Sequence, residues 1–193
     1  DLASLQGLKS TSGNYYLCAD VDLGGDGLDG QVGKLDKDRN MQECGADDAL
    51  FNPINYIANL NGVKKDKIGA DPASLTESDN YSIYNCKVVL NKHDGIGAGF
   101  IKQVTGTTNH SNINLIRAYV YNHHDETLPE QKYFEEDNGS GNAYAGTFVS
   151  TTGGTYNISN IHVSSGHVMA VCKIGGIIGR VSGVLNMSNC SVH

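Results

Sequence analysis

The sequence contains no tryptophan, only three prolines and no apolar run long enough to cross a membrane as a helix. Charged residues make up 18% of the chain, below the roughly 25% that is typical of soluble domains. The 14 basic residues are outnumbered by 21 acidic ones, which gives a formal net charge of -7. Because phosphate contacts dominate nucleic-acid affinity, this balance argues against a nucleic-acid partner.

Glycine is abundant, with 24 residues, and asparagine, serine, threonine and valine are also frequent. Glycine and asparagine tolerate left-handed backbone angles, and β-branched residues suit a pleated surface, so many short strands joined by tight turns are expected. A helical apolar pattern occurs in residues 1–9, which are expected to belong to a short N-terminal cap of about residues 1–13. The chain of 193 residues is long enough for a single domain, and the composition predicts an all-β one.

Internal repeats carry the strongest pattern in the chain. Residues 98–106 (AGFIKQVTG) align without gaps on residues 175–183 (GGIIGRVSG), and residues 145–153 (AGTFVSTTG) are a weaker third copy. Apolar segments with an asparagine follow each copy, and another lies upstream; their asparagines are Asn85, Asn114, Asn160 and Asn189. Asn85 and Asn114 are 29 residues apart, as are Asn160 and Asn189. The longer middle interval indicates an insertion, placed at the polar and acidic residues 123–142.

Repeats of this length predict a β-solenoid, since each short unit buries its apolar face only by stacking on its neighbours. The repeats are expected to cover about residues 83–192, and residues 24–82 are expected to be rich in loops. Equivalent apolar positions are expected to stack in inward columns; one would contain Cys86, Leu115, Ile161 and Cys190, and another Val88, Val163 and Val192. The asparagines are expected at corners, with side chains that hydrogen-bond along the stack.

Two segments resemble the GLUG repeats of bacterial surface adhesins. One is residues 175–183 (GGIIGRVSG) followed by residues 189–192 (NCSV). The other is Leu5 with residues 16–23 (YLCADVDL), which resembles the segment that opens such domains. Residues 51–54 (FNPI) are similar to the element that usually comes next. The resemblance implies a right-handed parallel β-helix on a secreted or cell-surface bacterial protein that binds a receptor. Because a fold hosts many functions, the role itself remains an analogy.

Aspartates gather near the N-terminus, and four of them are candidate calcium ligands: Asp20, Asp22, Asp26 and Asp29. Residues 24–29 (GGDGLD) match the start of a calcium-binding nonapeptide, and calcium takes six to eight oxygen ligands. The nonapeptide occurs only once, however, and the alternative is a solvated, turn-rich loop. Calcium is the one cofactor that the sequence suggests.

The insertion at residues 123–142 is the candidate binding surface, because long insertions on solenoids often carry contacts. Its candidate residues, with a tyrosine just before it, are Tyr121, His123, His124, Asp125, Glu126, Tyr133, Glu135 and Glu136. Adjacent histidines point to opposite sides of an extended chain, which disfavours one shared metal ion. A solvated loop is the alternative.

The predicted function is a non-catalytic, secreted or cell-surface adhesin-like module for a glycan or protein receptor. One alternative is a polysaccharide lyase or hydrolase on a β-helix, which would need paired carboxylates. The other is a structural stalk in a larger surface protein. Five cysteines leave at least one thiol unpaired within the chain, and a bridge from Cys18 to Cys44 stays open. End-to-end association is also expected, because a solenoid end exposes apolar side chains and unpaired backbone.

Overall fold

The computed structural model describes residues 10–23, 51–90, 97–122, 144–170 and 173–193. Within these residues, none of the helices has the length and apolar character needed to span a membrane. The first part of the chain forms β1 (Ser10–Tyr16), β2 (Val21–Asp22), β3 (Tyr56–Asn61), η1 (Lys65–Lys67), η2 (Pro72–Ser74), η3 (Glu77–Asp79), β4 (Tyr81–Tyr84) and β5 (Lys87–Leu90). The second part forms β6 (Ile101–Val104), β7 (Thr107–Ile116), β8 (Tyr119–Asn122), β9 (Tyr144–Gly146), β10 (Val149–Ser164), β11 (His167–Ala170), β12 (Lys173–Gly175), β13 (Ile178–Ser188) and β14 (Ser191–Val192).

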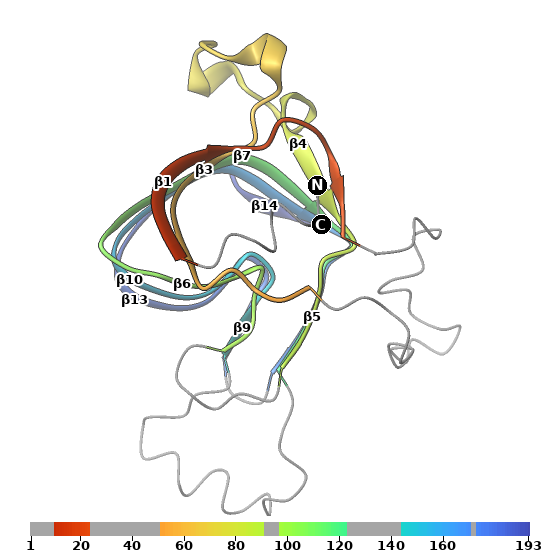
Figure 1. Cartoon of the computed structure of the whole chain (residues 1–193), viewed down its shortest axis with the longest axis vertical. Coiled ribbons are helices and arrows are strands. Elements are labelled where there is room, and N and C mark those ends of the chain that lie inside the picture. Colours follow the sequence, from red (N-terminus) through yellow and green to blue (C-terminus); the bar gives the residue numbers. More distant parts are fainter. Residues whose placement is uncertain (1–9, 24–50, 91–96, 123–143, 171–172) are drawn as a thin grey trace, which may run out of the picture.

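The chain is all-β, and the named strands pair in parallel with equivalent strands further along the sequence. The central sheet runs in the order β1-β3-β7-β10-β13, and two smaller sheets have the orders β11-β8-β5 and β12-β9. Figure 1 looks along this stack, so the central strands follow one curved arc, with β5 and β9 on its open side. Each level of the stack is called a rung below. The expectation of an all-β fold built from stacked parallel strands is confirmed.

Apolar side chains stack in columns inside the curve. One column joins the rungs through Val21, Ile83, Leu115, Val163 and Val192, in which successive residues are strand partners. The first four of these side chains are at most 7% exposed. A short strand cannot bury such a side chain alone, so stacking of rungs is what creates this core.

A second column is aromatic. The ring of Phe100 stacks between those of Phe51 and Phe148, with centroid distances of 5.2 and 5.8 Å. All three rings are nearly fully buried, and Ile54, Ile101 and Val149 form the adjoining column. Offset aromatic pairs add to the burial of apolar area, so these columns anchor the start of each long strand.

The long strands bend at a column of glycines. Gly154 has a φ of +71° and lies between Gly106 and Gly183, and a Cβ on Gly154 would come within 2.4 Å of the Gly106 carbonyl oxygen. Only glycine fits such an approach. The alignment of residues 101–106 on 178–183 is confirmed by this column and by the strand partners, but at its start Ala98 shares a column with Ile174 rather than Gly175, because both pair with Ala145. Residues 145–149 and 174–178 therefore each contain one residue more than residues 98–101, and Val149 rather than Phe148 pairs with Ile101 and Ile178.

The asparagine columns correct the repeat register expected from the sequence. Asn160 has Asn112, not Asn114, as its equivalent on the neighbouring rung, because Ser159 pairs with Ser111 and Ile161 with Ile113. Asn85 lies at a different corner, opposite Arg117; both residues have a positive φ. The inward columns shift accordingly: Leu115 aligns with Val163, and Val88 with Val120. Each rung has two corners that accept an asparagine, so spacing alone did not distinguish them.

The expected boundaries also change. Residues 1–9 of the expected cap lie outside the described residues, whereas residues 10–13 belong to β1 and pair with β3. Of the region expected to be rich in loops, residues 24–50 lie outside the described residues. Residues 51–61 instead supply Phe51, Ile54 and β3 to the second rung. The insertion at residues 123–142 also lies outside the described residues.

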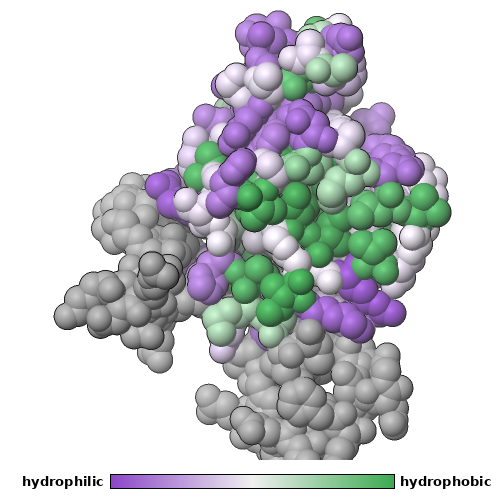
Figure 2. Space-filling view, turned by 180° about the vertical axis from the view of Figure 1, so that it is seen from behind, coloured by the Kyte–Doolittle hydropathy of each residue, from purple (hydrophilic) through white to green (hydrophobic). Residues whose placement is uncertain are grey.

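The last rung exposes its apolar side chains. Val181 and Met187 of β13 are each 45% exposed, although their strand partners Thr152 and Ile158 are buried. Val184 is 56% exposed, and its strand partner Thr155 is half-buried. Figure 2 shows apolar side chains gathered on the face seen from behind in Figure 1, where the C-terminal strands lie.

Candidate binding groove

A ladder of asparagine side chains runs over the outer face of the central sheet. Asn59, Asn109, Asn157 and Asn186 are strand partners in successive rungs. Each Nδ2 group donates to Oδ1 of the preceding rung: Asn109 to Asn59 at 2.7 Å, Asn157 to Asn109 at 2.8 Å and Asn186 to Asn157 at 2.8 Å. All four amides therefore point in the same direction along the stack.

Two residues further along each strand is a second outward column. It contains Asn61, Ser111, Ser159 and Ser188, which are again partners in successive rungs. On the first rung Tyr16 pairs with Asn61, and its side chain is 61% exposed. Because strand side chains alternate between faces, both columns lie on the same side of the sheet.

Residues 63–80, called the corner loop, rise beside these columns (Figure 1). The loop leaves the stack after Gly62 and returns at Tyr81, whose N–H donates to the Gly62 carbonyl. Between these points it forms the three short helices η1, η2 and η3. Asp71 caps η2 by accepting a hydrogen bond from the Ala73 N–H, and Pro72 fits the first helical position.

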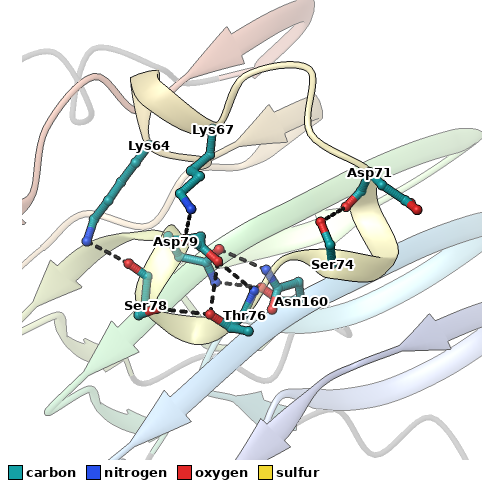
Figure 3. A network of polar contacts seen from close by, with 9 residues as sticks. Lys64, Lys67, Asp71, Ser74, Thr76, Ser78, Asp79 and Asn160 are labelled. Carbon is teal, nitrogen blue, oxygen red and sulfur yellow. Dashed lines mark hydrogen bonds and ion pairs between the residues drawn. The ribbon is translucent and has the colours of Figure 1, made fainter.

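Polar contacts within the corner loop give it a defined shape (Figure 3). The Asp79 carboxylate accepts hydrogen bonds from the N–H and the hydroxyl of Thr76, and lies 3.1 Å from Nζ of Lys67. Lys64 donates to the Ser78 carbonyl at 2.7 Å. The hydrogen bonds from Thr76 and Lys67 lower the pKa of Asp79, which keeps this carboxylate ionised at neutral pH.

The loop is also tied to two of the corner asparagines of the stack, Asn160 and Asn189. Asn80 donates to the Asn160 carbonyl at 3.0 Å, and Asn160 donates to Oδ1 of Asn80 at 2.9 Å. Asn189 contacts the Leu75 carbonyl at 3.4 Å, and Asn114 donates to the Glu77 carbonyl at 3.0 Å. These contacts hold the loop against the outer columns.

Three adjoining hollows that share lining residues lie over these two columns, and one of them lies between the second column and the corner loop. Together they form the amide groove, whose floor is Asn14, Asn59, Asn61, Asn109, Ser111, Asn157, Ser159, Asn186 and Ser188. Pro72, Ala73, Leu75 and Thr76 of the corner loop form a wall, and Tyr15 and Tyr16 lie at the β1 end. Among the described residues that line the groove there is no Asp, Glu, Lys or Arg.

The sequence-predicted binding residues are not in this groove. Tyr121 is half-buried in β8, in a different sheet from the amide ladder. The other predicted binding residues lie outside the described residues, and the structure places no contact for them: His123, His124, Asp125, Glu126, Tyr133, Glu135 and Glu136.

Two of the four candidate calcium ligands can be placed. The Asp20 carboxylate accepts from the Ser82 N–H at 2.8 Å, and the Asp22 carboxylate accepts from Nδ2 of Asn85 at 2.7 Å. Both carboxylates therefore already bind groups on β4 and at the corner that follows it. In the described part of the chain no three His, Cys, Asp or Glu side chains are grouped to hold a metal ion, and Asp26 and Asp29 lie outside that part.

His162 links the corner network to the last strand. Its Nε2 lies 2.7 Å from Oδ1 of Asn160, and its Nδ1 lies 2.8 Å from Oγ of Ser191. Since the Asn160 amide nitrogen donates elsewhere, Nε2 carries the proton and Nδ1 accepts from the Ser191 hydroxyl. Partial burial lowers the pKa of His162, so the ring is neutral at pH 7. In serine hydrolases Nε2 accepts the serine proton and a carboxylate holds Nδ1–H. Here Nδ1 faces the serine instead, and the group on the other nitrogen is the neutral amide of Asn160, which also bonds three other asparagines.

Three of the five cysteines can be described. Cys18 is exposed, Cys86 is buried and Cys190 is half-buried, and all three are free thiols. Burial raises the pKa of the Cys86 thiol far above its ordinary value, which keeps it protonated and unreactive. Cys44, the expected partner of Cys18, lies outside the described residues.

No protein-family model, no curated protein and no solved structure matches this chain. The amide groove is therefore interpreted from its own chemistry. Amides and hydroxyls both donate and accept hydrogen bonds, and the exposed ring of Tyr16 adds an apolar surface. A polyhydroxylated ligand matches this combination of groups.

Proposed function

We propose that the chain is a right-handed parallel β-helix of the GLUG-repeat kind and serves as a non-catalytic, adhesin-like module that binds a glycan outside a bacterial cell. The observation that carries the proposal is the amide groove, an open and uncharged surface with a repeated set of hydrogen-bonding groups. The stacked parallel rungs and the short repeats support the β-helix. A secreted or cell-surface location is part of the same proposal and follows from the resemblance.

The groove favours binding over cleavage. Glycoside hydrolysis and elimination need a carboxylic acid or another base beside the scissile bond, and usually two such groups. The described residues that line the groove supply amides, hydroxyls, apolar side chains and tyrosine rings, without a carboxylate, Lys or Arg. His110 also lines one hollow, but its imidazole is buried and both of its nitrogens contact the Tyr156 hydroxyl and the Ile57 carbonyl. A sugar chain in the groove would therefore be held and left intact.

Incubation with immobilised polysaccharides and mucins tests this proposal, once with calcium and once with a chelator. Retention of the protein without new reducing or unsaturated sugar ends is the expected result. New ends would contradict the non-catalytic assignment and favour the lyase or hydrolase. Retention that is lost on chelation would show that binding needs calcium, for which the sequence offers the candidate ligands Asp20, Asp22, Asp26 and Asp29. Absence of both retention and product would contradict glycan binding and favour the stalk or a protein receptor.

End-to-end self-association remains a separate prediction, supported by the apolar face of β13. We expect the sedimentation coefficient of the purified chain to rise with concentration. Val181→Asp should abolish this rise, because Val181 continues the buried column of Val104 and Thr152 and a charge at an apolar contact is costly. Thr107→Asp, on the exposed outer face of β7, is the matched control and should leave association unchanged. Monomeric behaviour of the unsubstituted chain at every concentration would contradict the prediction.

A further inference from the structure

The amide groove crosses the strands rather than following one of them. Its three hollows are lined by residues of β1, β3, β7, β10 and β13, the full order of the central sheet. Neighbouring parallel strands lie ~4.8 Å apart, so the four steps between these strands give a groove about 19 Å long. An elongated ligand in the groove would lie along the stack.

The floor presents the same groups at each step. Asn109 and Asn157, inside the ladder, each use one N–H and one lone pair of Oδ1 on their neighbours, which leaves a second N–H and a second lone pair on each of these amides. Because the ladder sets all the amides in the same direction, little side-chain entropy remains to be lost on binding. A surface with a repeated donor and acceptor pattern is matched best by a ligand that repeats at the same interval. A linear polysaccharide has this property, and a folded protein does not.

The charge of the ligand follows from the lining. Carboxylate or sulfate groups on an acidic polysaccharide would need cationic partners, and the described lining residues include no Lys or Arg. The chain as a whole carries a formal net charge of -7, which disfavours association with a polyanion. An uncharged sugar chain needs no cationic partner and is not repelled by the negative charge of the protein.

The two ends of the groove differ. Tyr16 at the β1 end is 61% exposed, and Tyr15 lines the same hollow. At the opposite end the floor closes with Asn186 and Ser188 of β13. An aromatic ring offers a flat apolar surface to the C–H face of a pyranose, so Tyr16 is placed to stack on a sugar at that end of the ligand.

We infer that the groove binds a linear, uncharged polysaccharide that lies along the stack, with about one sugar to each rung and one sugar against Tyr16. This inference rests on the proposed carbohydrate-binding function and names its ligand class. It differs from a pocket for one terminal sugar, whose affinity would not depend on chain length.

Calorimetric titration with cello-, chito- and manno-oligosaccharides, from disaccharide to octasaccharide, tests the inference. For at least one series, affinity should rise with each added sugar up to about the pentasaccharide and then level off, because the groove is about 19 Å long. Heparin and alginate are the acidic probes and should not bind. Equal affinity for all chain lengths, or binding of the acidic chains alone, would overturn the inference.

Ser159 is the residue to substitute, since it lies in the floor between Ser111 and Ser188 and lines two of the three hollows. Ser159→Tyr should reduce affinity for the pentasaccharide at least tenfold, because the ring fills the groove, whereas Ser159→Ala should change it less than threefold. Thr107→Tyr places the same ring on β7 outside the groove and should leave affinity unchanged. Tyr16→Ala should weaken binding of the pentasaccharide several-fold. Thermal unfolding of each variant establishes that it is folded.

The two proposals fail in different ways. Immobilised neutral polysaccharides could retain the protein while Ser159→Tyr binds the pentasaccharide as tightly as the unsubstituted chain. In that case carbohydrate binding is supported, but the groove is the wrong site. If no immobilised polysaccharide of any charge retains the protein, the proposed function and this inference are both wrong.

Discussion

Substitution of Asn160 by alanine is expected to lower the free energy of unfolding by about 3–5 kcal/mol, more than almost any polar substitution in a domain of this size. The Asn160 amide donates to Asn80 and Asn112 and accepts from His162 and Asn189, at 2.7–3.0 Å. Alanine would leave several of these partners buried without a hydrogen bond, at about 1–3 kcal/mol for each group. Asn160 also has a φ of 53°, which alanine adopts less readily than asparagine or glycine.

Chemical denaturation of Asn160→Ala and Asn160→Gly would separate these two causes. Both variants lose the hydrogen bonds, but glycine accepts a positive φ freely, so it should be less destabilised than alanine by about 1 kcal/mol. Asn186→Ala at the exposed end of the ladder is the control and should stay within about 0.5 kcal/mol of the unsubstituted chain. A loss below about 1 kcal/mol for Asn160→Ala would show that the corner network contributes little to stability.

Acidification is expected to destabilise the protein through His110. This ring is buried between its hydrogen bonds to the Tyr156 hydroxyl, at 2.9 Å, and the Ile57 carbonyl, at 2.8 Å. Burial lowers the pKa of His110 from 6.5 to about 4, and the hydrogen bond to the Ile57 carbonyl only partly opposes this shift. The unfolded chain therefore binds a proton at a higher pH than the folded chain. Stability from His110 is full above pH 6.5 and falls as the pH approaches 4, by about 3 kcal/mol in total.

Denaturation of the unsubstituted chain and of His110→Gln at several pH values between 7 and 4 would measure this contribution. Glutamine retains a donor and an acceptor but does not titrate, so its free energy of unfolding should fall less steeply with pH. The carboxylates and the partly buried His162 and His167 titrate in both proteins and cancel in the difference. Equal pH slopes would refute the assignment to His110. A proton NMR titration of the ring should give a midpoint near 4 for the folded protein.

Much of the fold was predictable because successive rungs of the stack place similar residue types at equivalent positions. The alignment of residues 98–106 on 175–183 placed Ile101 with Ile178 and Gly106 with Gly183, and both pairs share a column in the structure. The interval of 29 residues between Asn160 and Asn189 also matches one rung. Insertions hid the earlier rungs, since Asn59 and Asn109 are 50 residues apart and Asn109 and Asn157 are 48 apart.

The register of Asn85 and Asn114 was wrong for a physical reason. A rung turns at two corners where asparagine accepts a positive φ, and Asn85 lies at the second corner, while Asn112 and Asn160 lie at the first. The residue types at these corners are similar, so only pairing across the sheet distinguishes them.

The amide groove was not foreseen, although a signal for it existed. Asn-x-Asn or Asn-x-Ser occurs at residues 59–61, 109–111, 157–159 and 186–188, and in each case the pattern lies on a rung of the central sheet. Alternation with period two would have placed both polar positions on one face. The charged residues of the sequence indicated a binding surface at the insertion 123–142, whereas the groove is lined by uncharged side chains.

By itself the sequence determined that this chain is all-β, that its strands recur as stacked units and that glycine and asparagine occupy its bends, because these properties depend on local backbone preference and on repetition. Only the tertiary structure decided which asparagines share a column and that residues 63–80 fold back as a wall. It also decided that five separate strands place their amides and hydroxyls side by side. Contacts between residues about 50 positions apart depend on the length of every intervening insertion, and no local pattern encodes that length.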